Sequence, residues 1–364
     1  MKKLCCLLMG MVLLLASCAR ELPQNEHSVE ITGSPVQSLD GRVGYTGLVR
    51  KGDALYYVYN KDTITMKIVE ISADGVKTIY TEPSSPLSVE GMVGAPLLCV
   101  YEDELIIKSS DKILQYQTAT NQWVENGAWS QTEYLQYSNW YPLDDCVLYE
   151  CEEEDPENEL GSRYFIRCHQ DGESTTYEND YPRGSYYNPK RTLVYAHGDT
   201  VAYFERVYTA SDQQQYKVYK YSIDSAAEVC AFSTEPFSVY DPVEYFEGCT
   251  DNRWHVYRYM TYEEDVVIAN VNVLDLDDPQ ASPKTVYTCA SEVSVEGVYN
   301  GCIYIASENG VVKYNLETDE QTVLNDRYAE KCYILDDTWV YFVSDDASLW
   351  RVAQDGSVVE HVYG

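Results

Sequence analysis

The sequence predicts an all-β protein built from about seven four-stranded antiparallel units. Short apolar or aromatic runs recur after tight turns near positions 52, 103, 145, 198, 248, 301 and 337, on average about 47 residues apart. Beyond residue 17, no run shows the sustained i, i+3, i+4 apolar spacing of a helix. The central runs are apolar on both faces, so each sheet must stack on neighbours. Radial stacking at this repeat length predicts a β-propeller.

The last unit shows the order of elements most clearly. It consists of a first strand at 331–335, a turn at Asp336-Asp337, strands at 339–343 and 349–352, a turn at Asp355-Gly356 and a last strand at 358–362. Asp-Gly between two such runs is typical of a type I′ hairpin turn, because both central residues need positive φ. The fourth and fifth units carry long insertions, so six or eight blades also fit. A pair of β-sandwiches is the alternative fold.

The N-terminal segment predicts export. Lys2 and Lys3 precede an apolar run at 4–15, which is too short to span a bilayer of ~30 Å as a helix and is typical of a secretory signal. The run ends in Leu-Ala-Ser-Cys, which resembles the lipobox of bacterial lipoproteins. That resemblance implies cleavage before Cys18 and a lipid on Cys18; an ordinary signal peptide with a chance cysteine is the alternative. The expected organisation is a signal peptide at 1–17, a lipidated tether at 18–28 and one propeller domain at 29–364.

Residues 341–352 carry a second resemblance. Their sequence Tyr-Phe-Val-Ser-Asp-Asp-Ala-Ser-Leu-Trp-Arg-Val resembles the strand–turn–strand core of YWTD-type and TolB-like propeller repeats, and residues 55–60 and 303–314 look like weaker copies. The YWTD string itself is absent, as are the marks of WD40 and kelch repeats. With the lipobox, the chain resembles Tyr-rich extracytoplasmic propeller lipoproteins of bacteria, of unknown function. The resemblance implies a fold and a location at the cell membrane, and it transfers no catalytic residue.

Charge excludes several classes of partner. The chain holds 26 Lys and Arg against 59 Asp and Glu, a formal net charge of −33. Such a chain repels nucleic-acid phosphate and anionic headgroups, and no basic stretch offsets this. We therefore expect no nucleic-acid partner, and membrane contact only through the N-terminal lipid.

Cysteines and acidic runs predict neither a cofactor nor a metal. Nine cysteines remain after Cys5, Cys6 and Cys18 are set aside, and no Cys-x-x-Cys occurs. An odd number cannot all pair within one chain, and most lie in apolar runs, as small buried hydrophobes do. The acidic runs at 152–159 and 275–279 lack the spacing and the turn glycine of a calcium loop. We expect them to be solvated loops, with cation binding as the alternative.

No catalytic motif appears, so the candidate site is a binding face. Flat aromatic rings beside carboxylates, amides and an Arg suit sugars or peptides. The sequence therefore predicts a non-catalytic module for a glycan, peptide or protein, with an enzyme using channel carboxylates or a scaffold subunit of a membrane complex as alternatives. The candidate ligand-binding residues lie in the passage between the second and third units, in a long connection at 180–189 and near a predicted turn: Trp140, Tyr186, Tyr187, Arg253 and Trp254. Packing of these rings between blades is the alternative.

Overall fold

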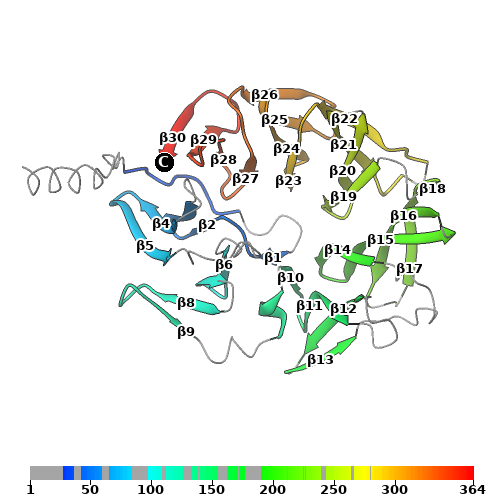
Figure 1. Ribbon diagram of the computed structural model, residues 1–364, viewed down its shortest axis with the longest axis horizontal. Coiled ribbons are helices and arrows are strands. Elements are labelled where there is room, and N and C mark those ends of the chain that lie inside the picture. The colour runs from blue at the N-terminus through cyan, green and yellow to red at the C-terminus, as the bar shows by residue number, and fades with distance from the viewer. Residues whose placement is uncertain are drawn as a thin grey trace, which may run out of the picture.

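The computed structural model shows seven antiparallel sheets arranged as a ring (Figure 1). The prediction of an all-β propeller with seven four-stranded blades is confirmed, and η1 (Glu133–Gln136), a short 3₁₀ helix, is the one helix among the described residues. The structure describes residues 28–36, 42–59, 65–83, 97–108, 112–125, 133–137, 139–154, 162–170, 172–176, 190–210, 212–223, 225, 227–238, 243–263, 266–278 and 280–364.

The first four blades follow chain order from the inner strand to the outer strand. Blade 1 contains β2 (Leu48–Lys51), β3 (Ala54–Tyr59), β4 (Thr65–Ser72) and β5 (Gly75–Pro83). Blade 2 contains β6 (Leu97–Tyr101), β7 (Glu104–Lys108), β8 (Ile113–Gln117) and β9 (Gln122–Glu125). Blade 3 contains β10 (Asn139–Pro142), β11 (Val147–Glu154), β12 (Ser162–Gln170) and β13 (Glu173–Thr176). Blade 4 contains β14 (Lys190–His197), β15 (Thr200–Ala210), β16 (Gln213–Ser222) and β17 (Ala227–Ser233), and β18 (Phe237–Ser238) extends its rim beside β16.

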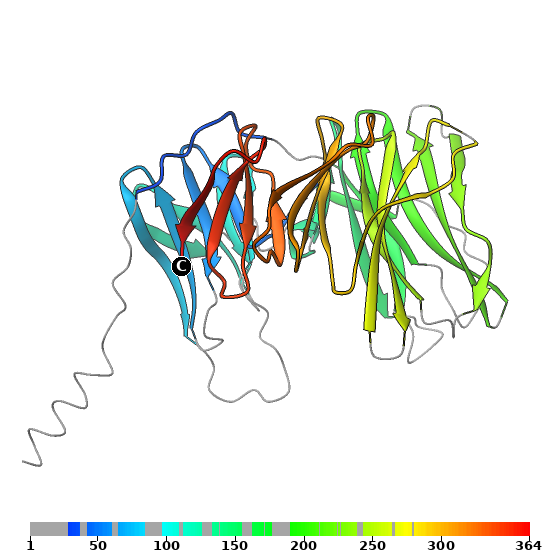
Figure 2. The same cartoon turned by 90° about the horizontal axis from the view of Figure 1, so that it is seen from above.

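The last three blades complete the ring with the same order. Blade 5 contains β19 (Val243–Thr250), β20 (Trp254–Glu263), β21 (Val266–Asp275) and β22 (Lys284–Cys289). Blade 6 contains β23 (Ser294–Tyr299), β24 (Cys302–Ser307), β25 (Gly310–Asn315) and β26 (Gln321–Asn325). Blade 7 contains β27 (Lys331–Tyr333), β28 (Trp339–Val343), β29 (Leu349–Ala353) and β30 (Val359–Tyr363). Figure 2 shows these strands running between the two ends of the ring.

One predicted turn is wrong. Gly248 lies inside β19, where the pairing with β20 shifts register between Phe246 and Cys249, and the turn follows at Asp251. The Asp251 Oδ1 atom accepts hydrogen bonds from the backbone N–H groups of Arg253 and Trp254, at 3.1 and 2.7 Å. A bulge adds a residue to one strand, so the glycine marks an irregularity in the ladder and the aspartate makes the turn.

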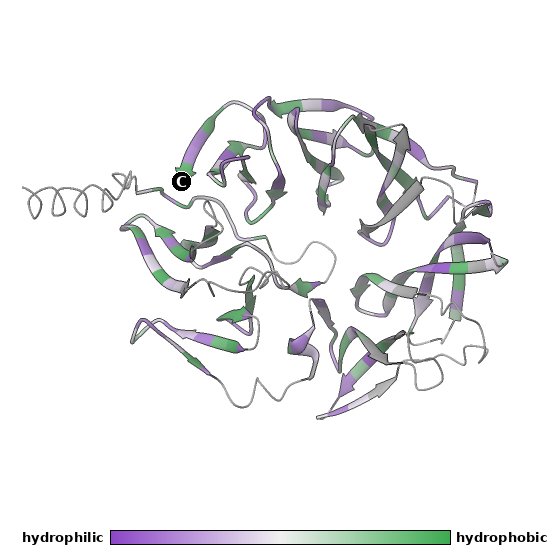
Figure 3. Cartoon of the chain, viewed as in Figure 1, coloured by the Kyte–Doolittle hydropathy of each residue, from purple (hydrophilic) through white to green (hydrophobic). Residues whose placement is uncertain are grey.

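The core lies between the blades. Seven clusters of buried apolar side chains lie one at each interface between neighbouring blades. Strand β24 shows why: all six of its residues are buried, with Ile303 packing toward blade 5 and Tyr304 toward blade 7. Because successive side chains of a strand point to opposite faces, one apolar strand supplies two interfaces. Figure 3 shows the mixture of hydrophobic and hydrophilic residues along the strands.

An N-terminal strap, residues 28–36, packs at the interface between blades 7 and 1. Val29 and Ile31 are buried in the cluster that joins these two blades. The Arg351 Nη1 atom of β29 donates to the Glu30 carbonyl at 2.9 Å, and the Trp339 indole N–H donates to Thr32 Oγ1 at 3.0 Å. Figures 1 and 2 show the blue strap beside the red strands of blade 7. The strap therefore reinforces the interface where the first blade meets the last.

The chain next runs along the inner side of the ring. Strand β1 (Val43–Gly44) pairs with β10 of blade 3, near the centre in Figure 1. Thr46 then forms a bridge to Leu98 of blade 2, before β2 begins blade 1. The segment at 43–46 thus contacts the inner strands of blades 3 and 2, and it supplies Tyr45 to the core between them.

Candidate functional site

The ring has two ends, and the turns and connections of the described residues can be assigned to one or the other. Consecutive antiparallel strands reverse direction, so the turns from the first to the second strand and from the third to the fourth lie at one end. We name it the Arg253 end, after the β19–β20 turn. The turns between second and third strands and the connections between blades lie at the Tyr328 end, named after the β26–β27 connection.

Arg253 links two blades at its end of the ring. Its guanidinium donates to Asp275 Oδ2 of blade 5, from Nε at 3.1 Å and from Nη2 at 2.9 Å. Its Nη1 atom donates to Glu317 Oε1 of blade 6 at 2.6 Å. The hydrogen bond from Arg253 lowers the pKa of the Asp275 carboxyl. Two carboxylates from neighbouring blades therefore share one cation.

Trp254 is held between that cation and the core. Its indole packs against the cluster between blades 5 and 6, and the Arg253 guanidinium carbon lies 4.7 Å from the ring centroid. The structure thus brings these two predicted residues together, as neighbours in a contact between blades. Their role in ligand binding stays a prediction. The contacts observed join blade 5 to blade 6.

The structure places Trp140 in the core. Its side chain is fully buried between blades 2 and 3. The Tyr45 ring meets it edge-on at 5.4 Å and the Tyr101 ring at 5.6 Å. The ring therefore has no exposed face for a ligand, and we correct this assignment to a packing role. Tyr186, Tyr187 and Cys18 lie outside the described residues.

An exposed aromatic ring at the opposite end was missed by the sequence reasoning. Tyr328 lies in the connection between β26 and β27, with 40% of its side chain exposed. Burial, followed by the charges of nearby carboxylates, raises its pKa. Those carboxylates belong to Glu330, Asp345, Glu292 and Glu308, all of them exposed. Tyr328 and these four residues form what we name the Tyr328 rim.

The loop that carries Tyr328 is anchored on both sides. The Ala329 N–H donates to the Ser307 carbonyl of blade 6 at 3.0 Å, and the Glu330 N–H donates to the Val343 carbonyl of blade 7 at 2.8 Å. Ala329 itself is buried. The chain therefore presents Tyr328 from a fixed backbone at the junction of two blades. Within the described ranges, no ion pair involves the four carboxylates of the rim.

Sequence offered only a weak signal for this rim. The run Asp326-Arg327-Tyr328 places an aromatic residue beside charged residues in a connection, and the sequence alone shows this. The four carboxylates come from four separate connections of blades 5, 6 and 7. Their placement near Tyr328 at one end of the molecule depends on how the blades stack, and no local pattern encodes it.

No group of three or more His, Cys, Asp or Glu side chains is placed to hold a metal ion in the part of the chain that the structure describes. Among the same residues, no helix has the length and hydropathy needed to cross a membrane.

The comparisons with known proteins identify no family for this chain. No family model matches the sequence, and no curated protein matches it. Oligogalacturonate lyase in complex with manganese is 10% identical, with a TM-score of 0.45, over 87% of this chain and 98% of the lyase. The tricorn protease is 12% identical, with a TM-score of 0.44, over 92% of this chain and 36% of the protease. BamB from Moraxella catarrhalis is 10% identical, with a TM-score of 0.31, over 92% of each chain.

Proposed function

We propose that this chain is a lipid-anchored, extracytoplasmic β-propeller that binds a cationic peptide, or a basic segment of a protein partner, at the Tyr328 rim and catalyses no reaction. The observation that carries the proposal is one exposed ring on an anchored loop, at the end of the ring of blades where four exposed carboxylates lie near enough for their charges to raise its pKa. The N-terminal lipid on Cys18 follows from the lipobox resemblance.

The chemistry of the rim favours Lys or Arg side chains. The face of a tyrosine ring attracts an ammonium or guanidinium group, by about 0.5–1 kcal/mol at an exposed site. Carboxylates around the ring add ion pairs and charge-assisted hydrogen bonds to the same cation. A neutral sugar would use the ring but not the charges, so a basic peptide fits the complete set of groups better.

The charge of the whole chain supports the same partner. A net charge of −33 attracts a basic segment from a distance and increases its rate of association. Long-range attraction alone is not selective, because it acts on every face. Selectivity has to come from the rim, where an aromatic ring and carboxylates meet on a backbone fixed by Ala329 and Glu330.

Calorimetry on the full chain with a Lys-rich peptide tests the proposal. We expect Glu308→Gln with Asp345→Asn to weaken binding about tenfold, equivalent to about 1.4 kcal/mol, and Tyr328→Ala to weaken it severalfold. The matched control is Asp53→Asn with Asp74→Asn. It removes the same charge from two exposed turns at the Arg253 end.

Three outcomes would contradict the proposal. The peptide could fail to bind, the control pair could lose as much affinity as the rim pair, or a Glu-rich peptide of equal length could bind equally well. An equal loss in the two pairs would show that only net charge attracts the peptide. Selective loss at the rim, with a steep dependence on salt, supports the rim as the binding site.

A further inference from the structure

Two cysteines of blade 3 meet on one face of neighbouring strands. Strands β11 and β12 pair in a register that places Leu148 opposite Cys168. Cys146 directly precedes β11 and packs on the same cluster as Leu148, and Cys168 lies on the corresponding face of β12 because it is paired with Leu148. Cys146 and Cys168 are therefore diagonal neighbours across the strand pair.

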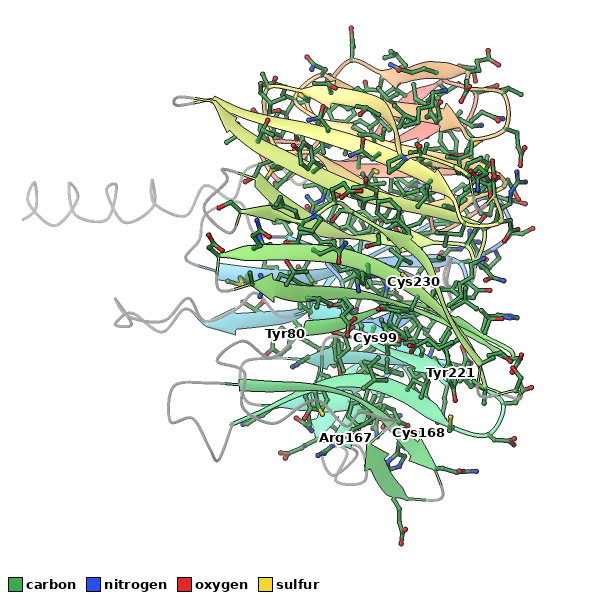
Figure 4. All side chains as sticks on the ribbon, turned by 90° about the vertical axis from the view of Figure 1, so that its right-hand side faces the viewer. Tyr80, Cys99, Arg167, Cys168, Tyr221 and Cys230 are labelled. Atoms are coloured by element: carbon green, nitrogen blue, oxygen red, sulfur yellow. The ribbon has the colours of Figure 1, made fainter. Side chains whose placement is uncertain are left out.

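The packing confirms that both thiols point the same way. Each is partly buried against the cluster between blades 3 and 4, which contains Leu148 and Ile166 from the same face. Tyr221 of β16 packs on that cluster too, and Figure 4 shows Cys168 and Tyr221 in the same region of the molecule. The register and this shared cluster therefore bring the two thiols to the same side of blade 3.

The geometry points to a reversible disulfide between Cys146 and Cys168. It forms by thiol–disulfide exchange, with an external disulfide as the oxidant. The five described cysteines at 99, 151, 289, 302 and 332 are buried, and Cys230 is exposed on the outer strand of blade 4. The pair is thus set apart by its place as diagonal neighbours on one face and by its partial exposure. This inference does not depend on what the Tyr328 rim binds.

Closing the bond requires a small movement of a turn. Diagonal neighbours across an antiparallel pair lie roughly 7–8 Å apart at Cα, whereas disulfides span about 4.4–6.8 Å. Cys146 precedes β11 and belongs to the turn closed by the hydrogen bond from the Leu143 N–H to the Cys146 carbonyl, at 2.7 Å. The turn can move toward Cys168 while the ladder of β11 and β12 stays paired.

The exchange balances with oxidised glutathione as the oxidant. One protein thiolate attacks the glutathione disulfide, forms a mixed disulfide and releases one glutathione thiolate. The second protein thiolate attacks the protein sulfur of that mixed disulfide and releases the second glutathione thiolate. The two protein thiols lose two protons and two electrons, and the glutathione disulfide becomes two thiols. Burial, with the Cys168 contact, raises the pKa of Cys146 to about 12, so closure should accelerate as pH rises.

Peptide mapping of the full chain, equilibrated with oxidised glutathione and alkylated after denaturation, tests the inference. We expect a cross-linked peptide that joins Cys146 to Cys168, a mass loss of two hydrogens and reversal by dithiothreitol. The closed form should melt several degrees above the reduced form, because a bond across the strands restricts the unfolded chain. Cys146→Ser and Cys168→Ser should each abolish the cross-link, whereas Cys230→Ser should leave it unchanged.

Two results would overturn the inference. Recovery of both residues alkylated under conditions that oxidise a control dithiol peptide would show that the thiols cannot join. Stable glutathione adducts on either cysteine, without the cross-link, would show that the second exchange step is blocked. Peptide mapping of the wild-type chain shows whether the disulfide forms, even if a serine variant fails to fold. Neither result bears on peptide binding at the Tyr328 rim.

Discussion

The Arg50 guanidinium lies 3.4 Å from the Asp336 carboxylate, and this ion pair joins the first blade to the last. The two side chains are 5% and 0% exposed. The Tyr341 hydroxyl donates to Asp336 Oδ2 at 2.7 Å, and Arg50 Nη2 donates to the Gly33 carbonyl of the strap at 2.9 Å. Among the described residues, each blade is a separate sheet and no sheet includes strands of both blades 7 and 1. The buried pair therefore links both blades and the strap at this interface.

Arg50→Met should destabilise the protein by about 3 kcal/mol, because it leaves the Asp336 carboxylate buried without its cation. Asp336→Asn removes the charge while it keeps an oxygen for the turn. Combining the two substitutions should therefore cost less than the sum of their separate effects. Urea unfolding monitored by tryptophan fluorescence measures the free energy of unfolding of each variant.

Lys284→Met is the control for this prediction. The Lys284–Asp319 ion pair is shorter, at 2.6 Å, but its side chains are 52% and 59% exposed. Exposed pairs contribute little because water and salt screen them. If Arg50→Met were no more destabilising than Lys284→Met, the buried pair would have no special role in closing the ring.

Gly33→Ala should loosen the strap by about 1–2 kcal/mol from backbone strain alone, with a further loss from crowding. The φ angle of Gly33 is +89°, and a Cβ atom there would lie 2.6 Å from Thr338 Oγ1 and 2.7 Å from Asp337 Oδ1. The control is Gly52→Ala, where φ is +58° and no atom lies within 4 Å of the added carbon. Limited proteolysis of the strap and thermal melting compare the two. Equal effects would show that backbone strain alone matters at Gly33.

Sequence predicted the blades well because each blade is a local structure. Asp336 and Trp339 illustrate this: the backbone N–H of Trp339 donates to Asp336 Oδ1 at 2.7 Å, so four consecutive residues specify the turn and the start of β28. Asp251 and Trp254 repeat the arrangement in blade 5. The prediction of a turn at Gly248 was wrong because the sequence alone does not distinguish a glycine in a bulge from a glycine in a turn.

The site was harder to predict because it depends on contacts between blades. Trp140 is buried by Tyr45, which the inner segment at 43–46 brings from a distant part of the chain. Arg253 reaches a carboxylate of the next blade, Glu317, and nothing near Arg253 in the sequence indicates this. Tyr328 gains its carboxylates in the same way. Composition predicted an acidic, aromatic surface, and the stacking of blades determined where the two properties coincide.

Cys18→Ser should release the protein from the membrane fraction of the producing cell, if Cys18 carries the lipid. The lipobox resemblance implies that Cys18 carries the lipid. Stable attachment to a membrane takes more than one acyl chain. Fractionation followed by detection of the full chain measures the change, with Cys230→Ser as a control that leaves the lipobox intact. Retention of Cys18→Ser in the membrane would contradict the lipid anchor.

His255 should make the stability of the protein depend on pH between about 4 and 6.5. Its side chain is fully buried on β20, where its ring stacks with Tyr257 at 5.4 Å and faces Phe204 at 6.4 Å. Neither ring nitrogen has a hydrogen-bond partner among the described residues. Burial lowers the pKa of His255 from 6.5 to about 4. In this range the unfolded chain binds a proton that the folded chain does not, so stability falls as pH falls, by up to about 3 kcal/mol.

His255→Phe separates this effect from the titration of the many carboxylates. Phenylalanine keeps a ring in the stack and has no proton to bind. We therefore expect the variant to match or exceed the wild type at pH 7.5, and to exceed it by a further 2–3 kcal/mol or so at pH 4.5. Urea unfolding at a series of pH values measures the difference, with His197→Gln at an exposed position as the control. A constant difference across the series would show that His255 titrates alike in the folded and unfolded chains.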